Sequence, residues 1–269
     1  MLNQFRLDGK FALVTGGTGV LGRAMCQALA GAGASVIVLA RNGERAANFA
    51  AELGQGADSF AADVMDKAAL ERCADHIRAQ YGRMDILVNC AGGNHKNATA
   101  VPNERSFFDL PADALQWVLN LNLMGTILPS QVFGALMAEQ KQGVILNVSS
   151  MASIRPLTRV VAYAGAKAAV NNFTQWLAVT MAQDYSPHIR VNAIAPGFFI
   201  GEQNYYLLYN EDDTLSARGQ QIIDHTPMNR FGKPEDLQGT VLWLVSDASR
   251  FVTGIVVPVD GGFSAFSGV

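Results

Sequence analysis

The sequence predicts an α/β protein in which a parallel sheet of seven strands carries helices on both faces. Short apolar runs alternate with longer amphipathic segments almost from end to end, which is the pattern of repeated strand–helix–strand units. The chain has 269 residues, of which 49% are apolar and 16% charged, so it can bury a large core. Because no linker, repeat or low-complexity tract divides this series, we expect one doubly wound domain over residues 1–269.

The strands are predicted from apolar runs of strand length that are separated by turn residues. They cover residues 11–15, 35–40, 58–63, 85–89, 143–149, 189–195 and 255–260. The helices between them are predicted from longer segments with helical apolar spacing, several of which follow Pro, Asn or Asp. They cover residues 19–32, 42–53, 66–81, 111–140, 160–185 and 233–246.

Charge and cysteine content exclude several classes of protein. The formal net charge of -3 argues against nucleic acid as a partner. The three cysteines are widely spaced, with no CxxC pair and no cluster of histidines, so neither a disulfide framework nor a metal site is predicted. The longest apolar stretch, 118–138, contains Asn120, Asn122 and Pro129, which argues against a membrane span. The N-terminus lacks the order of a signal peptide, and we expect an unprocessed cytoplasmic protein.

A glycine-rich turn, TGGTGVLG, follows the first predicted strand and precedes the first predicted helix. Glycines permit a tight turn and let the backbone approach a pyrophosphate at the helix N-terminus. Gly17, Gly19 and Gly22 also satisfy the pattern GxGxxG, which is informative here because the strand and the helix flank it. The turn therefore predicts a dinucleotide site of the Rossmann type.

The end of the second predicted strand bears on the choice of dinucleotide. An acid at this place would hold the ribose 2′-hydroxyl of NAD, whereas an arginine can accept the 2′-phosphate of NADP. The strand ends in Ala40 and is followed by Arg41, with Arg45 as further support. We therefore expect NADP(H), with NAD(H) as the alternative in which Arg41 is a solvated loop residue.

A candidate catalytic set follows the fifth predicted strand. Tyr163 and Lys167 are four residues apart at the start of a predicted helix, so they share one face and the ammonium can lower the pKa of the phenol. Lys167 could also hold the ribose of the cofactor. Ser150 lies where that strand ends, the edge at which ligands bind, and its hydroxyl could polarise a carbonyl or merely cap a turn.

Over essentially its whole length the sequence resembles the short-chain dehydrogenase/reductase family. The resemblance is carried by TGGTGVLG, Asp63 with Val64, NCAG at 89–92, Asn122, Ser150, the YxxxK pair of Tyr163 and Lys167, and Pro196 with Gly197. It implies that Ser150, Tyr163 and Lys167 are catalytic, that Asn122 supports a water-linked proton relay and that Asp63 lies near the adenine. The cofactor residues that it implies are Gly16, Thr18, Gly19, Val20, Leu21, Gly22, Arg41, Asp63, Val64, Asn89, Ala91, Gly92, Tyr163, Lys167, Pro196, Gly197 and Ile200.

The sequence departs from the family pattern at two positions. Val20 stands where the family has the middle glycine of its turn, and Gly19 comes one place early. Gly201 stands where many relatives have a threonine near the nicotinamide carboxamide. We therefore expect the pyrophosphate turn and the carboxamide contact to differ in detail.

Several longer segments resemble one subgroup of this family, the D-mannonate oxidoreductases (fructuronate reductases). These segments are AGGNHKNAT, FFDL, NFTQWLAV, IAPGFF, HTPMNRFGKPEDL and PVDGGFSAFSGV. The resemblance implies NAD(P)H-dependent reduction of the C5 ketone of D-fructuronate to D-mannonate. Such a substrate needs a cation and polar groups near Ser150. The candidates that we favour are Asn94, His95, Arg159 and Gln203; the others are Lys96, Arg155 and Asn204, and each could instead be a surface or subunit contact.

Other functions stay open. The enzyme could reduce another keto-sugar acid of the 5-ketogluconate type or a 3-oxoacyl thioester, although the polar AGGNHKN segment disfavours a long acyl group. An extended sugar-nucleotide epimerase would need more residues than this chain has. A dinucleotide-binding sensor without chemistry is disfavoured by the complete Ser, Tyr and Lys set. The resemblance also implies a homotetramer with the tail, 251–269, at a subunit contact.

The one long predicted connection runs over residues 196–232 and holds several aromatic residues beside an acidic run at 211–213. A connection of this length is typical of a lid or binding loop, and we expect a substrate lid near 197–232. The alternative is a small helical excursion that packs its aromatic side chains on the domain and leaves its acids in solvent.

Overall fold

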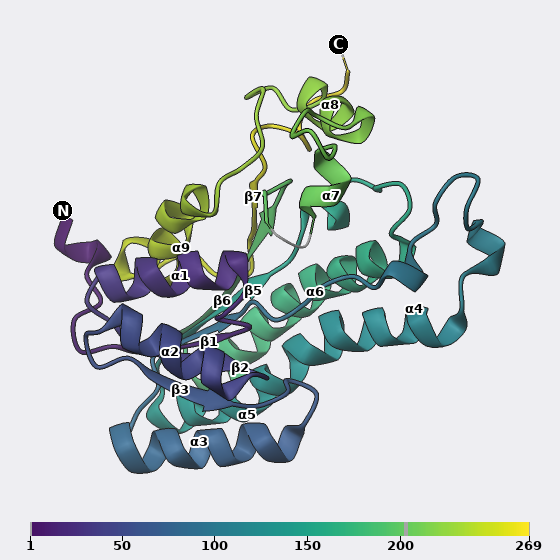
Figure 1. The fold of residues 1–269 in the computed structure, drawn as a ribbon. Helices are drawn as coiled ribbons and strands as arrows, with labels where there is room; N and C mark the ends of the chain where they lie inside the picture. The colour runs from purple at the N-terminus through teal and green to yellow at the C-terminus, as the bar shows by residue number, and fades with distance from the viewer. Residues whose placement is uncertain (1, 202–203, 269) are drawn as a thin grey trace.

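Seven parallel strands form one sheet in the computed structural model, which describes residues 2–201 and 204–268 (Figure 1). They are β1 (Phe11–Thr15), β2 (Ser35–Ala40), β3 (Asp58–Ala61), β4 (Ile86–Asn89), β5 (Gly143–Val148), β6 (Ile189–Pro196) and β7 (Val256–Val259). The strand order is β3-β2-β1-β4-β5-β6-β7. The chain therefore winds outwards in two directions from the β1–β4 pair, and ligands of open sheets bind at such a switch point.

Helices cover both faces of the sheet. They are α1 (Val20–Gly31), α2 (Gly43–Leu53), α3 (Lys67–Tyr81), α4 (Ala112–Leu119), α5 (Gly125–Gln140), α6 (Val161–Thr180), α7 (Tyr205–Leu208), α8 (Ala217–Asp224) and α9 (Gln238–Val245). One core cluster joins α1, α2 and α9 to the sheet, and a second joins α3, α5 and α6 to its other face. The predicted fold, a single doubly wound domain of the Rossmann type, is confirmed.

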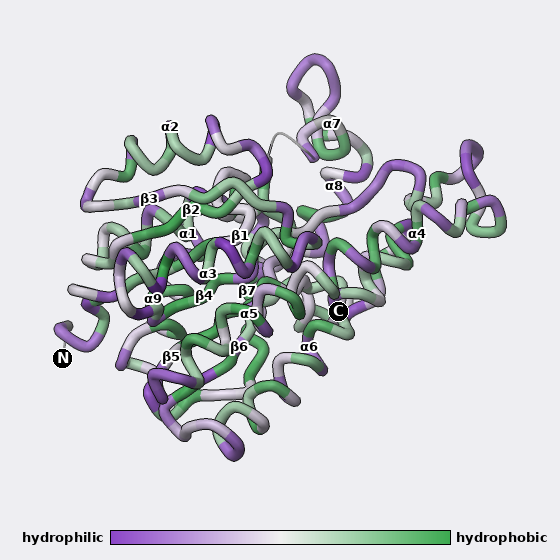
Figure 2. The backbone as a smooth tube through the Cα atoms, turned by 90° about the horizontal axis from the view of Figure 1, so that it is seen from below, coloured by the Kyte–Doolittle hydropathy of each residue, from purple (hydrophilic) through white to green (hydrophobic). Residues whose placement is uncertain are grey.

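Both faces of the central strands are buried, which explains why these strands read as unbroken apolar runs. In β1, Ala12 and Val14 belong to one core cluster, whereas Leu13 belongs to the other, and all three are fully buried. Figure 2 shows the same feature as green strands enclosed by helices whose outer turns are more hydrophilic.

The predicted boundaries differ from the structure mainly at strand ends. β1 and β2 have their predicted bounds, whereas β3 was predicted to reach Asp63 and ends at Ala61. Asp63 forms a turn instead, because its Oδ1 accepts a hydrogen bond from the Met65 backbone N–H at 2.9 Å. The turn places Asp63 just beyond the end of β3, in the lining of the cavity described below.

Two helices that were predicted as continuous contain π-helical segments. The predicted helix 111–140 is divided by Asn120–Met124 between α4 and α5, and the predicted helix 160–185 ends in Met181–Tyr185 after α6. Inside the first segment the fully buried amide of Asn122 donates to the Val118 carbonyl at 2.8 Å. Such an insertion widens a helix, and π-bulges occur frequently at functional sites.

The stretch Ala112–Gln140 is long and apolar enough to cross a membrane by length and composition alone. Half of its most apolar window is buried within the protein, and Phe133, Leu136 and Met137 belong to the core under the sheet. It thus has the burial of a core helix.

The long connection after β6 is partly helical, because it contains α7 and α8. Leu208, Ile222 and Phe231 form a small core of their own, against which Phe198 and Tyr209 pack. Phe198 and Tyr209 are therefore packed side chains, as the alternative to a lid expects. The acidic run at 211–213 is exposed. That the segment acts as a substrate lid stays a prediction.

Candidate active site

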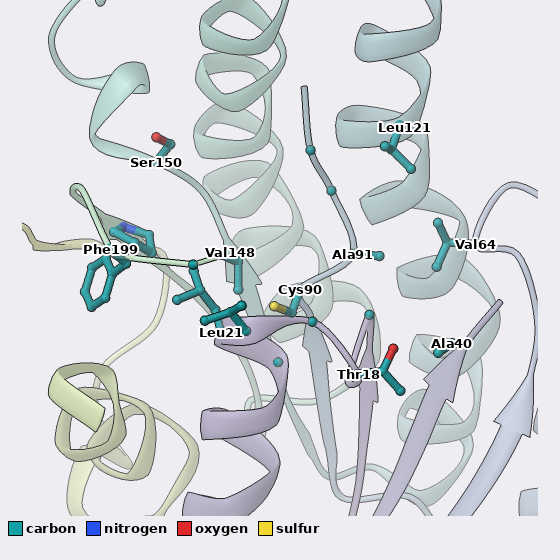
Figure 3. Close-up of a pocket in the computed structure, with 18 of the residues that line it drawn as sticks. Thr18, Leu21, Ala40, Val64, Cys90, Ala91, Leu121, Val148, Ser150 and Phe199 are labelled. Atoms are coloured by element: carbon teal, nitrogen blue, oxygen red, sulfur yellow. The ribbon is translucent and has the colours of Figure 1, made fainter. Parts of the chain in front are cut away.

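A cavity of about 450 Å³ opens where β1, β4, β5 and β6 end, and this volume is typical of a ligand site. In Figure 3, Leu21 lies beside Cys90 and Val148, while Ala40 and Ser150 lie at opposite ends of the labelled set. The sequence-predicted residues that line the cavity are Gly16, Thr18, Gly19, Val20, Leu21, Gly22, Arg41, Asp63, Val64, Ala91, Gly92, Ser150, Tyr163, Lys167, Pro196, Gly197 and Ile200.

The glycine-rich turn folds back on the start of α1. Gly16 has a φ of 65°, and a Cβ placed there would lie 2.9 Å from the Cα of Ala91. A Cβ on Gly22 would lie 2.3 Å from the Gly16 carbonyl oxygen, so neither position has room for a side chain. Gly19 caps α1 without a side-chain hydrogen bond, which leaves the first N–H groups of the helix for a ligand. These features fit the pyrophosphate of a dinucleotide.

The two departures from the family pattern meet in space. Val20 and Gly201 both line the cavity. A Cβ on Gly201 would lie 3.1 Å from Cγ2 of Val20, so the valine side chain fills the space beside the glycine. The missing glycine in the turn and the missing threonine after β6 are therefore one coupled feature of this cavity.

Ser150, Tyr163 and Lys167 lie together at one end of the cavity. The hydroxyl of Ser150 accepts a hydrogen bond from the Ala152 N–H at 3.2 Å, so this serine also caps the short helix that follows β5. Lys167 is buried, its Nζ lies 5.7 Å from the ring centroid of Tyr163, and it donates to the Val148 carbonyl at 2.8 Å. The three side chains predicted to be catalytic are thus brought together.

Burial dominates the ionisation of this set. It raises the pKa of Tyr163, although a hydrogen bond with Ser150 acts in the opposite direction. It also lowers the pKa of Lys167 to about 8. The expected effect of Lys167, a lowered pKa of the phenol, is not the net result in this arrangement, because burial penalises both charged forms. At neutral pH the phenol therefore keeps its proton and can donate it.

Asn122 lies below the cavity rather than on its surface. Its amide donates to the Gly93 carbonyl at 2.7 Å and accepts from the Gly93 N–H at 3.1 Å. A Cβ on Gly92 would lie 2.7 Å from the Asn122 Oδ1 and 3.2 Å from the Lys167 Nζ. Asn122 thus holds the turn after β4 in place next to the lysine, and its expected part in a proton relay stays a prediction.

Asn89 also lies outside the cavity lining. Its fully buried amide donates to the Ser130 hydroxyl and to the Asn147 Oδ1, each at 2.9 Å. These bonds tie β4 to α5 and β5. A direct contact of Asn89 with a cofactor is therefore not supported by its position, because the end of β4 turns its side chain into the core.

A polar network next to Ser150 was not predicted from the sequence. The hydroxyl of Ser149 donates to the Asn171 Oδ1 at 2.5 Å, and the Asn171 amide donates to the Ser153 hydroxyl at 2.7 Å. Ser153 in turn donates to the Ser150 carbonyl at 2.5 Å. Asn171 thus fixes the two serines that flank the turn of Ser150. The signal that could have found it is its spacing, because it lies one helical turn after Lys167 on α6.

The predicted substrate residues after β4 make local contacts. Asn94 is exposed, and Lys96 is exposed on a short helix. The Nδ1 of His95 accepts a hydrogen bond from the Asn97 N–H at 3.1 Å, and its ring packs edge-on at 5.4 Å from that of Trp117. None of these three residues is in the cavity lining. The contacts of His95 are those of a residue that holds its own loop.

The other predicted substrate residues have varied surroundings. Arg155 donates to the Ser264 carbonyl at 2.9 Å and so holds the tail, whereas Arg159 is half-buried with a φ of 77°. Asn204 lines the cavity and donates to the Phe199 carbonyl at 2.7 Å. Gln203 lies outside the described residues. The sequence also missed Phe199 and Cys90, two apolar parts of the lining.

The part of the chain that the structure describes contains no candidate metal site. No group of three or more His, Cys, Asp or Glu side chains there could hold an ion. The three cysteines are free, and burial raises the pKa of Cys90 to about 11. The arrangement is suited to proton donation to a carbonyl next to a bound dinucleotide.

Comparisons with known proteins agree with this geometry. A family model described as enoyl-(acyl carrier protein) reductase matches residues 18–264. The uncharacterized oxidoreductase UxuB of Bacillus subtilis is 47% identical over 98% of both chains. A candidate D-mannonate oxidoreductase of Haemophilus influenzae, solved with bound NAD, is 42% identical, with a TM-score of 0.91 over 98% of both chains. A gluconate 5-dehydrogenase of Burkholderia cenocepacia, solved with NADP and tartrate, is 32% identical, with a TM-score of 0.88 over 98% of this chain and 99% of that chain.

The network next to Ser150 predicts a specific effect of Asn171 on turnover. We expect Asn171→Ala to lower kcat about tenfold, because Ser150 loses its fixed orientation, and to leave the KM for the dinucleotide unchanged. Steady-state kinetics of dinucleotide oxidation with a ketone measure both constants. The matched control is Asn172→Ala, which changes an exposed neighbour on the same helix. Equal kcat values for the two variants would contradict the prediction.

The pKa of Lys167 predicts how stability depends on pH. In the folded protein this pKa is lowered from 10.5 to about 8, so between these values the unfolded chain binds more protons and stability rises with pH. We expect the free energy of unfolding of the wild type, relative to Lys167→Met, to rise by up to about 3 kcal/mol over this window. Urea unfolding at several pH values measures it. Lys67→Met, at an exposed position of α3, is the control, and parallel pH profiles for wild type and Lys167→Met would exclude the effect.

Proposed function

Because the chain belongs to the short-chain dehydrogenase/reductase family, we propose that it is an NAD(P)-dependent oxidoreductase that interconverts D-fructuronate and D-mannonate. The observation that carries the substrate is the 42% identity, over 98% of both chains, to the candidate D-mannonate oxidoreductase. That the chain is an oxidoreductase of this family follows from the matches to the family model and to the curated relative.

The mechanism uses the three side chains at the end of the cavity. Ser150 donates a hydrogen bond to the ketone oxygen, and Tyr163 donates its proton to the alkoxide as it forms. A bound nicotinamide supplies the hydride. Because burial raises the pKa of Tyr163, the phenol is in the proton-donating form that ketone reduction requires. Lys167 lies close enough to stabilise the phenolate that remains and to hold the cofactor ribose.

A second candidate substrate has its own support. The gluconate 5-dehydrogenase that was solved with NADP and tartrate shares 32% identity and the same fold with this chain. 5-Ketogluconate and D-fructuronate are both six-carbon acids with a ketone at C5, so one site could accept either. A keto-sugar acid is therefore the substrate class that we propose, and D-fructuronate is the member that the higher identity favours.

NADP(H) is the dinucleotide that we propose. Arg41 lines the cavity at the end of β2, and Ala40 occupies the place where an acid would hold the NAD ribose. Asp63 lies across from them after β3 and suits a contact with the adenine. One neighbour was solved with bound NAD and another with NADP.

We also propose self-association, as a homotetramer, in the cytoplasm. Trp176 and Val179 of α6 and Trp117 of α4 are among the exposed large apolar side chains, and such side chains mark contact surfaces where they gather. The three cysteines are free, which suits a reducing compartment.

The proposal predicts dinucleotide oxidation by the purified protein with D-fructuronate. We expect kcat/KM for D-fructuronate to exceed that for 5-ketogluconate, and Tyr163→Phe to lower kcat by at least about 100-fold because the proton donor is lost. Initial rates with NADPH and NADH measure the activity, and dinucleotide fluorescence shows that the variant still binds its cofactor. Turnover of 5-ketogluconate alone would move the assignment to that acid, and near-native turnover by Tyr163→Phe would overturn the mechanism.

The proposed role of Arg41 predicts the choice of dinucleotide. We expect Arg41→Asp to lower kcat/KM for NADPH by at least about tenfold and to favour NADH, because the carboxylate repels a 2′-phosphate and can accept from the 2′-hydroxyl. Arg72→Asp, on the exposed face of α3, is the control for added negative charge. An unchanged NADPH to NADH ratio in Arg41→Asp would show that Arg41 is a solvated loop residue.

A further inference from the structure

We propose that the C-terminal turn, residues 260–266, fixes the place of Ser150 relative to Phe198, which lines the same active-site cavity. Arg155 and Phe263 are the positioning residues through which this turn acts. The sequence singled out Arg155 as a possible contact of the substrate, whereas in the structure it bonds to the C-terminal turn. The inference rests on the proposed function only for the role of Ser150 at the ketone, and it holds for any ketone that the enzyme reduces.

The C-terminal turn is organised by Asp260, which follows β7. Its two carboxylate oxygens accept hydrogen bonds from the N–H groups of Gly262 and Ser264, each at 2.9 Å. Gly261 and Gly262 have φ values of 64° and 88°, which residues with a side chain rarely adopt. The turn therefore has a defined shape, and other segments can be held in place by contacts with it.

Arg155 joins the C-terminal turn to the stretch of chain that carries Ser150. The Arg155 Nε donates a hydrogen bond to the carbonyl of Ser264 at 2.9 Å, and Ser264 is buried. The Arg155 N–H donates to the Met151 carbonyl at 3.0 Å, and the Ser153 N–H donates to the Ser150 carbonyl at 2.9 Å. These short-range bonds make the stretch one compact turn, so a displacement of Arg155 is transmitted to Ser150.

Phe263 joins the C-terminal turn to the segment after β6. Its ring packs edge-on against the ring of Phe198, with the two centroids 5.2 Å apart. It also packs edge-on at 4.8 Å from the ring of His225, which follows α8, and it contacts the small core that holds this helix. Since Phe198 and Ser150 both line the active-site cavity, the C-terminal turn is linked to two parts of its wall.

A second cavity, of about 210 Å³, lies between the C-terminal turn and the segment after β6. Its lining includes Asp260 and Gly261 of the turn, and Phe198 and Met228 of the segment. A space of this size lets two segments approach or part unless local contacts hold them, because close packing is what makes an interior rigid. The ring of Phe263 on Phe198 and the bond from the Met228 N–H to the Gly261 carbonyl, at 3.1 Å, are such contacts.

The effect of these contacts concerns the ketone rather than the dinucleotide. In the proposed mechanism Ser150 donates to the ketone oxygen, and a misplacement of about 1 Å in an active site can lower the rate about 100-fold. Arg155 and Phe263 do not line the active-site cavity themselves. The loss of either side chain should therefore weaken the use of the ketone and leave the affinity for NADP unchanged.

Hydrogen exchange of the full-length protein tests the coupling without any substrate. We expect Arg155→Ala and Phe263→Ala each to speed the exchange of the Ser153 and Ile154 N–H groups at least about fivefold, because the bonds of these groups close the turn of Ser150. The N–H of Gly19, in the glycine-rich turn, should exchange as in the wild type. Arg155→Lys can still donate to a carbonyl and should exchange more slowly than Arg155→Ala. Circular dichroism checks folding, and Phe263→Leu replaces Phe263→Ala if that variant is unfolded.

Steady-state kinetics and a double-mutant cycle test the effect on turnover. We expect Arg155→Ala and Phe263→Ala each to lower kcat/KM for the ketone about tenfold, with the Kd for NADP unchanged. Because the two contacts act through one turn, the double variant should be little worse than either single variant, whereas independent effects would multiply to about 100-fold. The matched controls are Arg250→Ala and Phe251→Ala, two exposed neighbours.

Three results would each overturn the inference. They are unchanged exchange in either single variant, effects on kcat/KM that multiply in the double variant, and a loss of NADP affinity as large as the loss of kcat/KM. If the wild type turns over neither D-fructuronate nor 5-ketogluconate, the proposed substrate class fails, and exchange at Ser153 and Ile154 alone decides the inference. Faster exchange in both single variants then supports it, and unchanged exchange in either overturns it.

Discussion

The close approach of Gly22 to Gly16 is the constraint on which the rest of the site depends. A Cβ on Gly22 would lie 2.3 Å from the Gly16 carbonyl, so α1 can begin this close to the end of β1 only without a side chain there. The approach points the uncapped N-terminus of α1 at the switch point of the sheet. Because β1 pairs with both β2 and β4, the same point gathers the ends of the strands that carry Arg41 and Ala91. A cofactor site follows from this geometry.

The opposite end of the cavity is governed by burial rather than by charge. Lys167 is buried and donates to a carbonyl of β5, and burial lowers its pKa, while the pKa of Tyr163 is raised. Burial disfavours the Lys167 ammonium, and it also disfavours the Tyr163 phenolate, which would accept the proton when an alcohol is oxidised. At neutral pH the fold thus holds the charged Lys167 at a cost in stability, whereas the neutral phenol of Tyr163 carries no such cost. Asn171 and Asn122 supply the neutral hydrogen bonds that keep the surroundings of both groups fixed.

The sequence predicted the sheet and the proximity of Ser150, Tyr163 and Lys167 because both depend on local patterns. Strand runs, helical spacing and the YxxxK pair are readable within a few residues, and the carboxyl edge of a parallel sheet then brings Ser150 to Tyr163. What could not be predicted depends on contacts between distant segments. Asn89 turns into the core because Ser130 and Asn147 bind its amide, and Asn122 of the π-helical segment binds the backbone of Gly93. No local pattern encodes such partners.

The contrast between the two ends of the site explains how one fold serves different substrates. The dinucleotide residues lie at strand ends whose positions are fixed by the ladder of the sheet, and relatives with about a third of their residues in common keep that fold. The segment after β6, in contrast, contains a short helix, α8, that packs through a separate small core of Leu208, Ile222 and Phe231. This segment can change without disturbing the sheet. The pair of Val20 and Gly201 shows the limit of this freedom, because where the segment after β6 meets the cofactor turn, a Cβ at position 201 would lie in tight contact with the Val20 side chain. The segment after β6 is therefore constrained most closely where it meets the cofactor turn.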